Sequence, residues 1–249
     1  ARRLSLEGLA LTKVQVKNET LQTMPLLDQL TTLLSEQLPT HEAHAAATAL
    51  LNVLVTEMRH RGALIASDKV DLDDDRLSPT HGQYSFRLEG GGDPTNRVYS
   101  WLPATGRTNR REQYVRKFLA KIGETDGTGE RAEILLRFAF EGLQAASIID
   151  RPSVKAAGYA VVPQQLEVLH GQDSDWFECD TCRTVTPFNV LNLCTNGSCE
   201  GTLRPLNTSS DVFLSHHYRD LAENMELIPL RAKEHTAQWT SEAVSYTHL

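Results

Sequence analysis

The chain has few cysteines, few aromatic residues and no long apolar run. Only four of its 249 residues are cysteines, and 6% are aromatic. No signal peptide is visible, and no stretch approaches the roughly 18 consecutive apolar residues that a membrane-spanning helix needs. These absences exclude a disulfide-rich secreted scaffold and a transmembrane protein, so we expect a protein of the reducing cytoplasm.

The chain also lacks an excess of positive charge. It has 25 Lys and Arg residues against 32 Asp and Glu residues, which gives a formal net charge of −7. A strongly basic overall field, which would attract nucleic acid without specificity, is therefore excluded. Any basic surface on this protein has to be local.

Sequence motifs of common catalytic centres are missing as well. The chain has no Gly-x-x-x-x-Gly-Lys-Ser/Thr loop to hold a triphosphate and no Asp-Glu-x-His/Asp box to hold magnesium. It has no Gly-x-Ser-x-Gly turn to present a nucleophilic serine. We therefore expect no catalytic residue in this chain.

The cysteines that are present fall in one short segment and form a C-x2-C and a C-x4-C pair. Two close pairs of thiolates complete the tetrahedron that zinc prefers, and such spacing is typical of a zinc site. Four thiolates leave no coordination position for water, so we expect a structural zinc. Two disulfides or four free core thiols are the alternatives. The predicted ligands are Cys179, Cys182, Cys194 and Cys199.

Hydrophobic periodicity predicts a helical hairpin in the first part of the chain. Leucines at helical spacing follow Pro25 up to residue 38, and a second apolar helical pattern covers 41–66. The short connection between them is typical of an αα-hairpin. The preceding residues 1–17 alternate as in a short strand pair or an extended edge. The aspartate-rich stretch that follows, 68–75, is interpreted as a solvated linker rather than a cation site.

The middle of the chain predicts two helices followed by a β-hairpin. The helices are expected at 109–122 and 130–148, and a period-two pattern with a turn at 163–165 follows. This order resembles the second half of a winged-helix domain. Beyond the cysteines, a short helix is expected at 215–223 and a strand at 227–231.

One segment departs from the acidic balance of the chain. Between residues 97 and 121, seven Lys and Arg residues accompany a single acid, and Tyr99, Trp101 and Tyr114 are interleaved with them. Basic residues mixed with aromatics are typical of a nucleic-acid interface. An ordinary solvated helix face that packs on the aspartate-rich stretch is the alternative. The candidate contacts to nucleic acid are Arg107, Arg110, Arg111, Lys117 and Lys121.

Two segments carry a resemblance to a known family. Residues 3–11, Arg-Leu-Ser-Leu-Glu-Gly-Leu-Ala-Leu, are similar to an R-S-L-E-G-L-G-L segment. Residues 232–238, Ala-Lys-Glu-His-Thr-Ala-Gln, are similar to an A-x-E-H-T-A-Q segment. Both resemble large bacterial superfamily 2 DEAD/DEAH-box helicases of the DNA-repair and phage-defence type. The resemblance implies that a motor-domain motif includes Glu234, His235, Thr236 and Gln238.

The resemblance implies an internal fragment of an ATP-dependent helicase. The ATPase motifs, with their ATP and magnesium, would lie outside this chain, and the second RecA-like motor domain would begin near Ile228. The absence of an initiator Met agrees with this expectation, and residues 244–249 resemble a translated sequencing-adapter scar. The partners would be nucleic acid, with DNA favoured over RNA, and the remaining motor domains. A non-enzymatic zinc-ribbon adaptor that binds protein partners is the alternative.

These patterns together predict an α+β fold in consecutive parts. The expected parts are a helical hairpin region with an acidic linker at 1–96, a winged-helix-like region at 97–170, a zinc ribbon at 171–210, the start of a RecA-like domain at 211–243 and an artefactual tail at 244–249.

Overall fold

A computed structural model describes most of the chain up to the cysteine-rich segment and little beyond it. The described residues are 5–66, 84–124, 127, 129–153, 156–208, 219–220 and 224. Several sequence predictions lie outside these residues. They are the aspartate-rich stretch 68–75, most of the helix at 215–223, the strand at 227–231, the RecA-like start with Glu234, His235, Thr236 and Gln238, and the tail at 244–249.

The predicted helical hairpin is confirmed. After the single turn of α1 (Asn18–Leu21), helix α2 (Pro25–Leu34) packs against the long helix α3 (Thr40–His60). Pro25 lies in the first turn of α2, where the missing N–H of proline costs no hydrogen bond. The leucines of α2 recur every three to four residues and point into one core. The buried leucines are Leu26, Leu27, Leu30 and Leu34.

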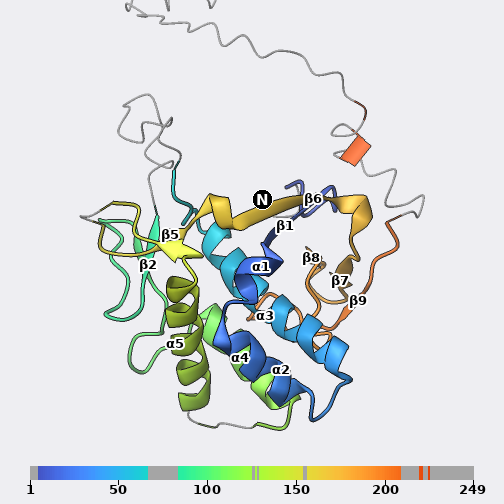
Figure 1. The fold of residues 1–249 in the computed structure, drawn as a ribbon, viewed down its shortest axis with the longest axis horizontal. Coiled ribbons are helices and arrows are strands. Elements are labelled where there is room, and N and C mark those ends of the chain that lie inside the picture. Colours follow the sequence, from blue (N-terminus) through green and yellow to red (C-terminus); the bar gives the residue numbers. More distant parts are fainter. Residues whose placement is uncertain are drawn as a thin grey trace, which may run out of the picture.

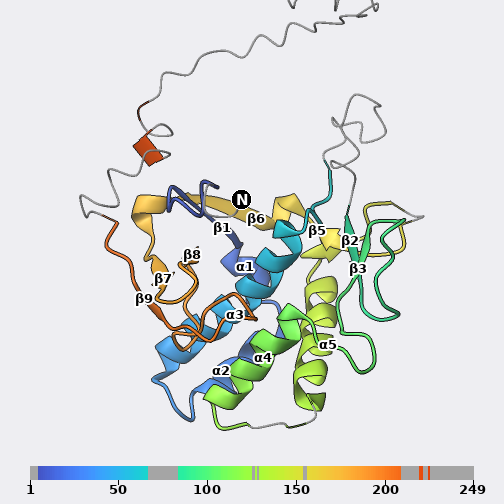
Figure 2. The ribbon, with the colours of Figure 1, turned by 180° about the vertical axis from the view of Figure 1, so that it is seen from behind.

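The two later helices are also confirmed, with slightly earlier ends. Helix α4 (Arg110–Lys121) starts at Asn109, whose side-chain oxygen accepts a hydrogen bond of 3.0 Å from the backbone N–H of Glu112. Helix α5 (Glu130–Ala145) packs against α4. Helix α2 lies in front of α4 in Figure 1 and behind it in Figure 2, and α5 lies beside both; these helices and α3 form the helical part of the molecule.

Six short strands form three two-stranded sheets beside the helical part. In the views of Figures 1 and 2, β6 runs along one end of the helices, whereas β2, β3 and β5 lie beside α5. The pairs are β1 (Thr12–Val16) with β6 (Leu166–His170), β2 (Ser85–Arg87) with β3 (Val98–Ser100), and β4 (Ile149–Asp150) with β5 (Ala160–Val161).

The predicted β-hairpin around 163–165 does not form. Strand β5 pairs with β4, whereas β6 pairs with β1, about 150 residues earlier in the chain, and Val14 lies opposite Val168. The 3-10 helix η3 (Pro163–Gln165) lies between the two strands and directs them to different partners. Period-two alternation predicts a strand but not its partner, so the sequence pattern could not show that β5 and β6 pair with other strands instead of with each other. Of the predicted N-terminal strands, only the extended edge at 12–16 is present.

Aromatic side chains fill part of the core between the helices. Trp101 and Phe118 are fully buried, and the indole N–H of Trp101 donates a hydrogen bond of 2.7 Å to the carbonyl of Leu136. Tyr114 is also buried. Trp101 and Tyr114, which the sequence placed among the surface residues of a nucleic-acid interface, are therefore core residues in the structure. Among the described residues, none of the helices has the length and apolar character needed to cross a bilayer.

A single buried amide fixes β1 to α3, and its removal should destabilise the fold. Asn52 is 2% exposed; its Oδ1 accepts a bond of 2.8 Å from the N–H of Val16, and its Nδ2 donates to the carbonyl of Thr48 at 3.1 Å. We expect Asn52→Ala to lower the free energy of unfolding by about 1–3 kcal/mol, because a buried N–H loses its acceptor. Denaturant unfolding measures this, with the exposed His41→Ala on the same helix as the control. Equal midpoints for the two variants would contradict the expectation.

Candidate metal centre and the adjoining pocket

The four cysteines lie in a small module, residues 176–206, which we call the cysteine module. Its antiparallel sheet has the order β8-β7-β9. One cysteine pair lies at the end of β7 and in the turn after it, and the other lies in the loop before β9, so the sheet brings the pairs together. The strands are β7 (Phe177–Cys179), β8 (Val185–Thr186) and β9 (Leu203–Pro205).

The four sulfur atoms form a compact set that can hold a metal ion such as zinc. They all lie within 4.8 Å of one another, with Sγ–Sγ distances of 3.7 Å for Cys179–Cys199 and 3.5 Å for Cys182–Cys194. A tetrahedral zinc with Zn–S bonds of about 2.3 Å requires S–S edges of about 3.8 Å. All four cysteines are free, and their sulfurs are too far apart for the disulfide alternative.

Backbone geometry supports this arrangement from both loops. In the first loop, the N–H of Cys179 donates to the carbonyl of Thr184 at 3.0 Å, and Arg183 adopts a left-handed φ of 58° to close the turn. In the second loop, the N–H of Gly201 donates to Cys199 Sγ at 3.3 Å. Such N–H···S bonds stabilise a thiolate, as a metal ligand requires.

The thiols differ in their readiness to ionise. Burial acts to raise the pKa of Cys182, but hydrogen bonds from Thr184 outweigh it and lower that pKa to about 6. Burial raises the pKa of Cys194 and of Cys199 above that of an ordinary thiol. Close packing of the four sulfurs therefore favours ionisation of one thiol but opposes ionisation of the others, since neighbouring thiolates repel one another. The positive charge of a bound divalent cation would offset this repulsion, and the remaining thiol protons would be released when the metal binds.

The cysteine module is docked on α4. The ammonium group of Lys117 donates to the carbonyl of Cys199 at 2.5 Å and to that of Asn196 at 3.3 Å. One turn earlier, Gln113 accepts a bond of 3.1 Å from the hydroxyl of Ser198. Gly197 lies so close to α4 that a Cβ atom there would be 2.0 Å from the carbonyl oxygen of Arg110. The second cysteine loop is thus fitted to the helix surface.

The structure separates the predicted nucleic-acid contacts into residues that are buried or bonded within the protein and residues that are exposed. Arg111 is 8% exposed and donates to the carbonyls of Ser100 and Trp101, so it is a core residue; burial lowers its pKa to about 10. Lys117 is bound to the cysteine module, as described above. The candidate contacts that remain exposed are Arg107, Arg110 and Lys121.

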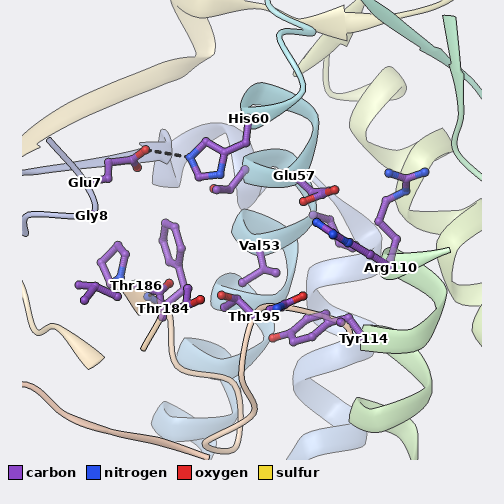
Figure 3. A pocket seen from close by; sticks show the side chains of 18 of the residues that line it. Glu7, Gly8, Val53, Glu57, His60, Arg110, Tyr114, Thr184, Thr186 and Thr195 are labelled. Carbon is purple, nitrogen blue, oxygen red and sulfur yellow. Dashed lines mark hydrogen bonds and ion pairs between the residues drawn. The ribbon is translucent and has the colours of Figure 1, made fainter. Parts of the chain in front are cut away.

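A cavity of about 80 Å³ lies where the cysteine module meets the helices (Figure 3). Its walls come from α3, the start of α4, both loops of the module and the turn at residues 5–11. No sequence pattern indicated this pocket, because its walls come from five segments that only the fold brings together. The residues that line it include Val53, Glu57, His60, Arg110, Tyr114, Thr186, Phe188 and Thr195.

The turn at residues 5–11 forms one wall of the pocket and is fixed by an ionic cluster. Both carboxylate oxygens of Glu7 accept from Arg59, at 2.6 and 2.7 Å, and His60 lies 3.2 Å away. Figure 3 shows the side chains of Glu7 and His60 joined by this contact at the edge of the pocket. Burial acts to raise the pKa of Glu7, but the bonds from His60 and Arg59 prevail and hold it below its ordinary value.

Among the described residues that line the pocket, Tyr114 has the one polar group that is fully buried and has no hydrogen-bond partner. The side chain is 2% exposed, and its hydroxyl has no hydrogen-bond partner among the residues that the structure describes. Figure 3 shows this hydroxyl pointing from α4 toward the loop of Thr195. Burial, with a smaller effect from Cys194, raises the pKa of Tyr114, so the phenol stays protonated and can donate.

Comparison with known proteins identifies no relative. No family model, no curated protein and no solved structure matches this chain. The resemblance to superfamily 2 helicases therefore stays a prediction.

A glycine beside the sulfurs offers a direct test of the metal centre. A Cβ atom at Gly201 would lie 2.6 Å from Cys179 Sγ, so Gly201→Ala has to displace a ligand. We expect this variant to lose zinc to a chelator at least tenfold faster than the parent, as distorted ligand geometry weakens binding. Gly127→Ala is the matched control, because no atom of the described residues lies within 4 Å of its added methyl group. Equal rates of zinc loss in both variants would show that the four sulfurs are not the ligands.

Proposed function

We propose that this chain is a zinc-binding accessory region that contacts nucleic acid in an ATP-dependent helicase. The observation that carries the proposal is the docking of the four-cysteine module on α4, the helix that also presents exposed cations. The metal would organise one side of a surface whose other side binds phosphates. The chain would have no ATPase activity of its own.

The metal in this proposal is zinc with a structural role. Four thiolates complete its tetrahedron, so no position is open for a substrate or an activated water. The module has a very small core, made of the cysteines and Leu203 with Phe177 beside them. A core of this size does not fold by burial alone, and metal binding would supply the missing free energy.

The proposed contact surface consists of the three cations that the structure leaves exposed. Arg107 and Arg110 lie just before and at the start of α4, and Lys121 lies at its end. Flexible, solvated cations are suited to phosphates, since neutralising a phosphate releases condensed counterions. In a chain of net charge −7, such contacts would be local and sensitive to salt.

The assignment to a helicase depends on the sequence resemblance at 3–11 and 232–238. In the parent protein, ATP and magnesium would be bound by motor domains outside this chain. The proposed division of labour is that the motor moves the strand while this region holds or guides it.

A protein-binding adaptor remains the second candidate, and one observation favours it. Ile134 and Phe138, one turn apart on α5, are 46% and 54% exposed. Neighbouring exposed apolar side chains of this size are typical of a protein contact. They lie on a different helix from the cations of α4, so the two candidates can be tested separately.

The salt dependence of DNA binding distinguishes the two candidates. We expect the chain to bind short DNA weakly, with an affinity that falls steeply as salt rises. Replacing Arg107, Arg110 and Lys121 with Ala should reduce the slope of log affinity against log salt by about 2–3, because each phosphate contact contributes roughly 0.7–0.9. Fluorescence anisotropy over a salt series measures this slope.

The control is a second triple variant with the same change in net charge. Arg131 and Arg137 lie on α5 and Arg151 lies beyond it, so none of the three is on α4, and their replacement with Ala should leave the slope unchanged. If both triple variants alter the slope equally, only net charge matters and the surface on α4 is not a binding site. If neither variant nor parent binds DNA, the adaptor is favoured.

A further inference from the structure

We propose that the pocket between α3, α4 and the cysteine module receives one unstacked base of a single nucleic-acid strand. This inference rests on the proposed function and makes it more specific. Three observations point to it: a partly apolar cavity, an enclosed hydroxyl group without a partner among the described residues, and an exposed arginine at the same place.

The size and walls of the pocket suit a flat organic group. Its volume of about 80 Å³ is several times the roughly 10–15 Å³ that one water molecule requires. Val53, Leu54 and Phe188 provide apolar contact, while the threonines of the module provide polar groups beside them. Bases are recognised in single strands by this combination of aromatic or apolar contact with hydrogen bonds to their edges.

The hydroxyl of Tyr114 provides the specific polar contact. A buried hydroxyl without a partner destabilises a fold, so a sequence that retains one has a use for it or fills the place with a ligand. The phenol is neutral and can donate. The edges of all bases carry ring-nitrogen or carbonyl acceptors, so one donor at this depth would hold a base without selecting a sequence.

The position of Arg110 connects the pocket to the phosphate surface. Arg110 lines the pocket and is itself exposed, and it begins α4, whose first backbone N–H groups favour negative charge. Tyr114 lies one turn further along the same helix. A nucleotide with its phosphate at Arg110 could therefore place its base toward Tyr114, since both residues line the pocket from the same helix.

The test uses the whole zinc-loaded chain and a single-stranded oligonucleotide of roughly ten nucleotides with one 2-aminopurine. Stacking between neighbours quenches this fluorescent base, so we expect its emission to rise when the protein binds. Tyr114→Phe should weaken binding roughly fivefold, the effect of one hydrogen bond, and leave the salt slope unchanged. The same variant should unfold at an equal or higher temperature than the parent, because it removes a buried hydroxyl for which the described part of the chain offers no partner.

Tyr99→Phe is the matched control, because Tyr99 packs with Phe86 and Tyr84 and does not line the pocket. It should change neither fluorescence nor affinity. Binding without a rise in emission, with Tyr114→Phe equal to the parent, would overturn the inference and leave the proposed function standing. Absence of any oligonucleotide binding would overturn both.

Two further outcomes would assign the pocket differently. If Tyr114→Phe loses zinc to a chelator faster than the parent, the hydroxyl supports the nearby Cys194 thiolate and the base-binding inference fails. If free adenosine monophosphate binds as tightly as the oligonucleotide, the pocket is a site for a soluble nucleotide, and the inference of a strand contact fails. We expect zinc retention equal to the parent and much weaker binding of the free nucleotide, which has only one phosphate to contact the cations of α4.

Discussion

The hydrogen bonds from Lys117 to the carbonyls of Cys199 and Asn196 join the cysteine module to α4 and so to the helical part of the molecule. The proposed pocket, and the proposed link between the metal centre and the surface of α4, depend on that contact. It positions the second cysteine loop on α4, and the same loop then forms one wall of the pocket that Tyr114 enters. An ammonium group that bonds to the backbone carbonyl of a candidate metal ligand also links the two parts energetically, because the carbonyls that it contacts keep their direction only while the loop is folded. The metal centre and the contact surface would therefore form as one unit.

Sequence periodicity predicted the helices well because each has a leucine- or aromatic-rich face at helical spacing, as in α2 from Leu26 to Leu34. The cysteine cluster followed from spacing alone, since few arrangements other than a metal site place four thiols in two close pairs. Strand partners could not be predicted in the same way. Strand β6 pairs with β1 across most of the chain, and nothing local at 166–170 specifies that partner.

The sequence spacing of Arg111 already indicates that it is a core residue. It lies four residues before Val115 and seven before Phe118, both buried, so its position in α4 was on the apolar face from the start. A guanidinium can occupy such a position because it has five donors, which here reach the carbonyls of Ser100 and Trp101. The number of charges in the segment does not distinguish the buried Arg111 from its exposed neighbour Arg110. The pocket, in contrast, had no signal in the sequence, because its walls are distant in the chain.

The most direct test of the central claim is the metal content of the purified chain together with hydrogen exchange before and after chelation. We expect one zinc per chain, and after its removal faster exchange over residues 176–206 and in the adjoining turns of α4 around Lys117, while α2 and α5 keep their protection. A zinc content near zero after purification under reducing conditions would contradict the claim, and so would exchange that is unchanged when the metal is removed.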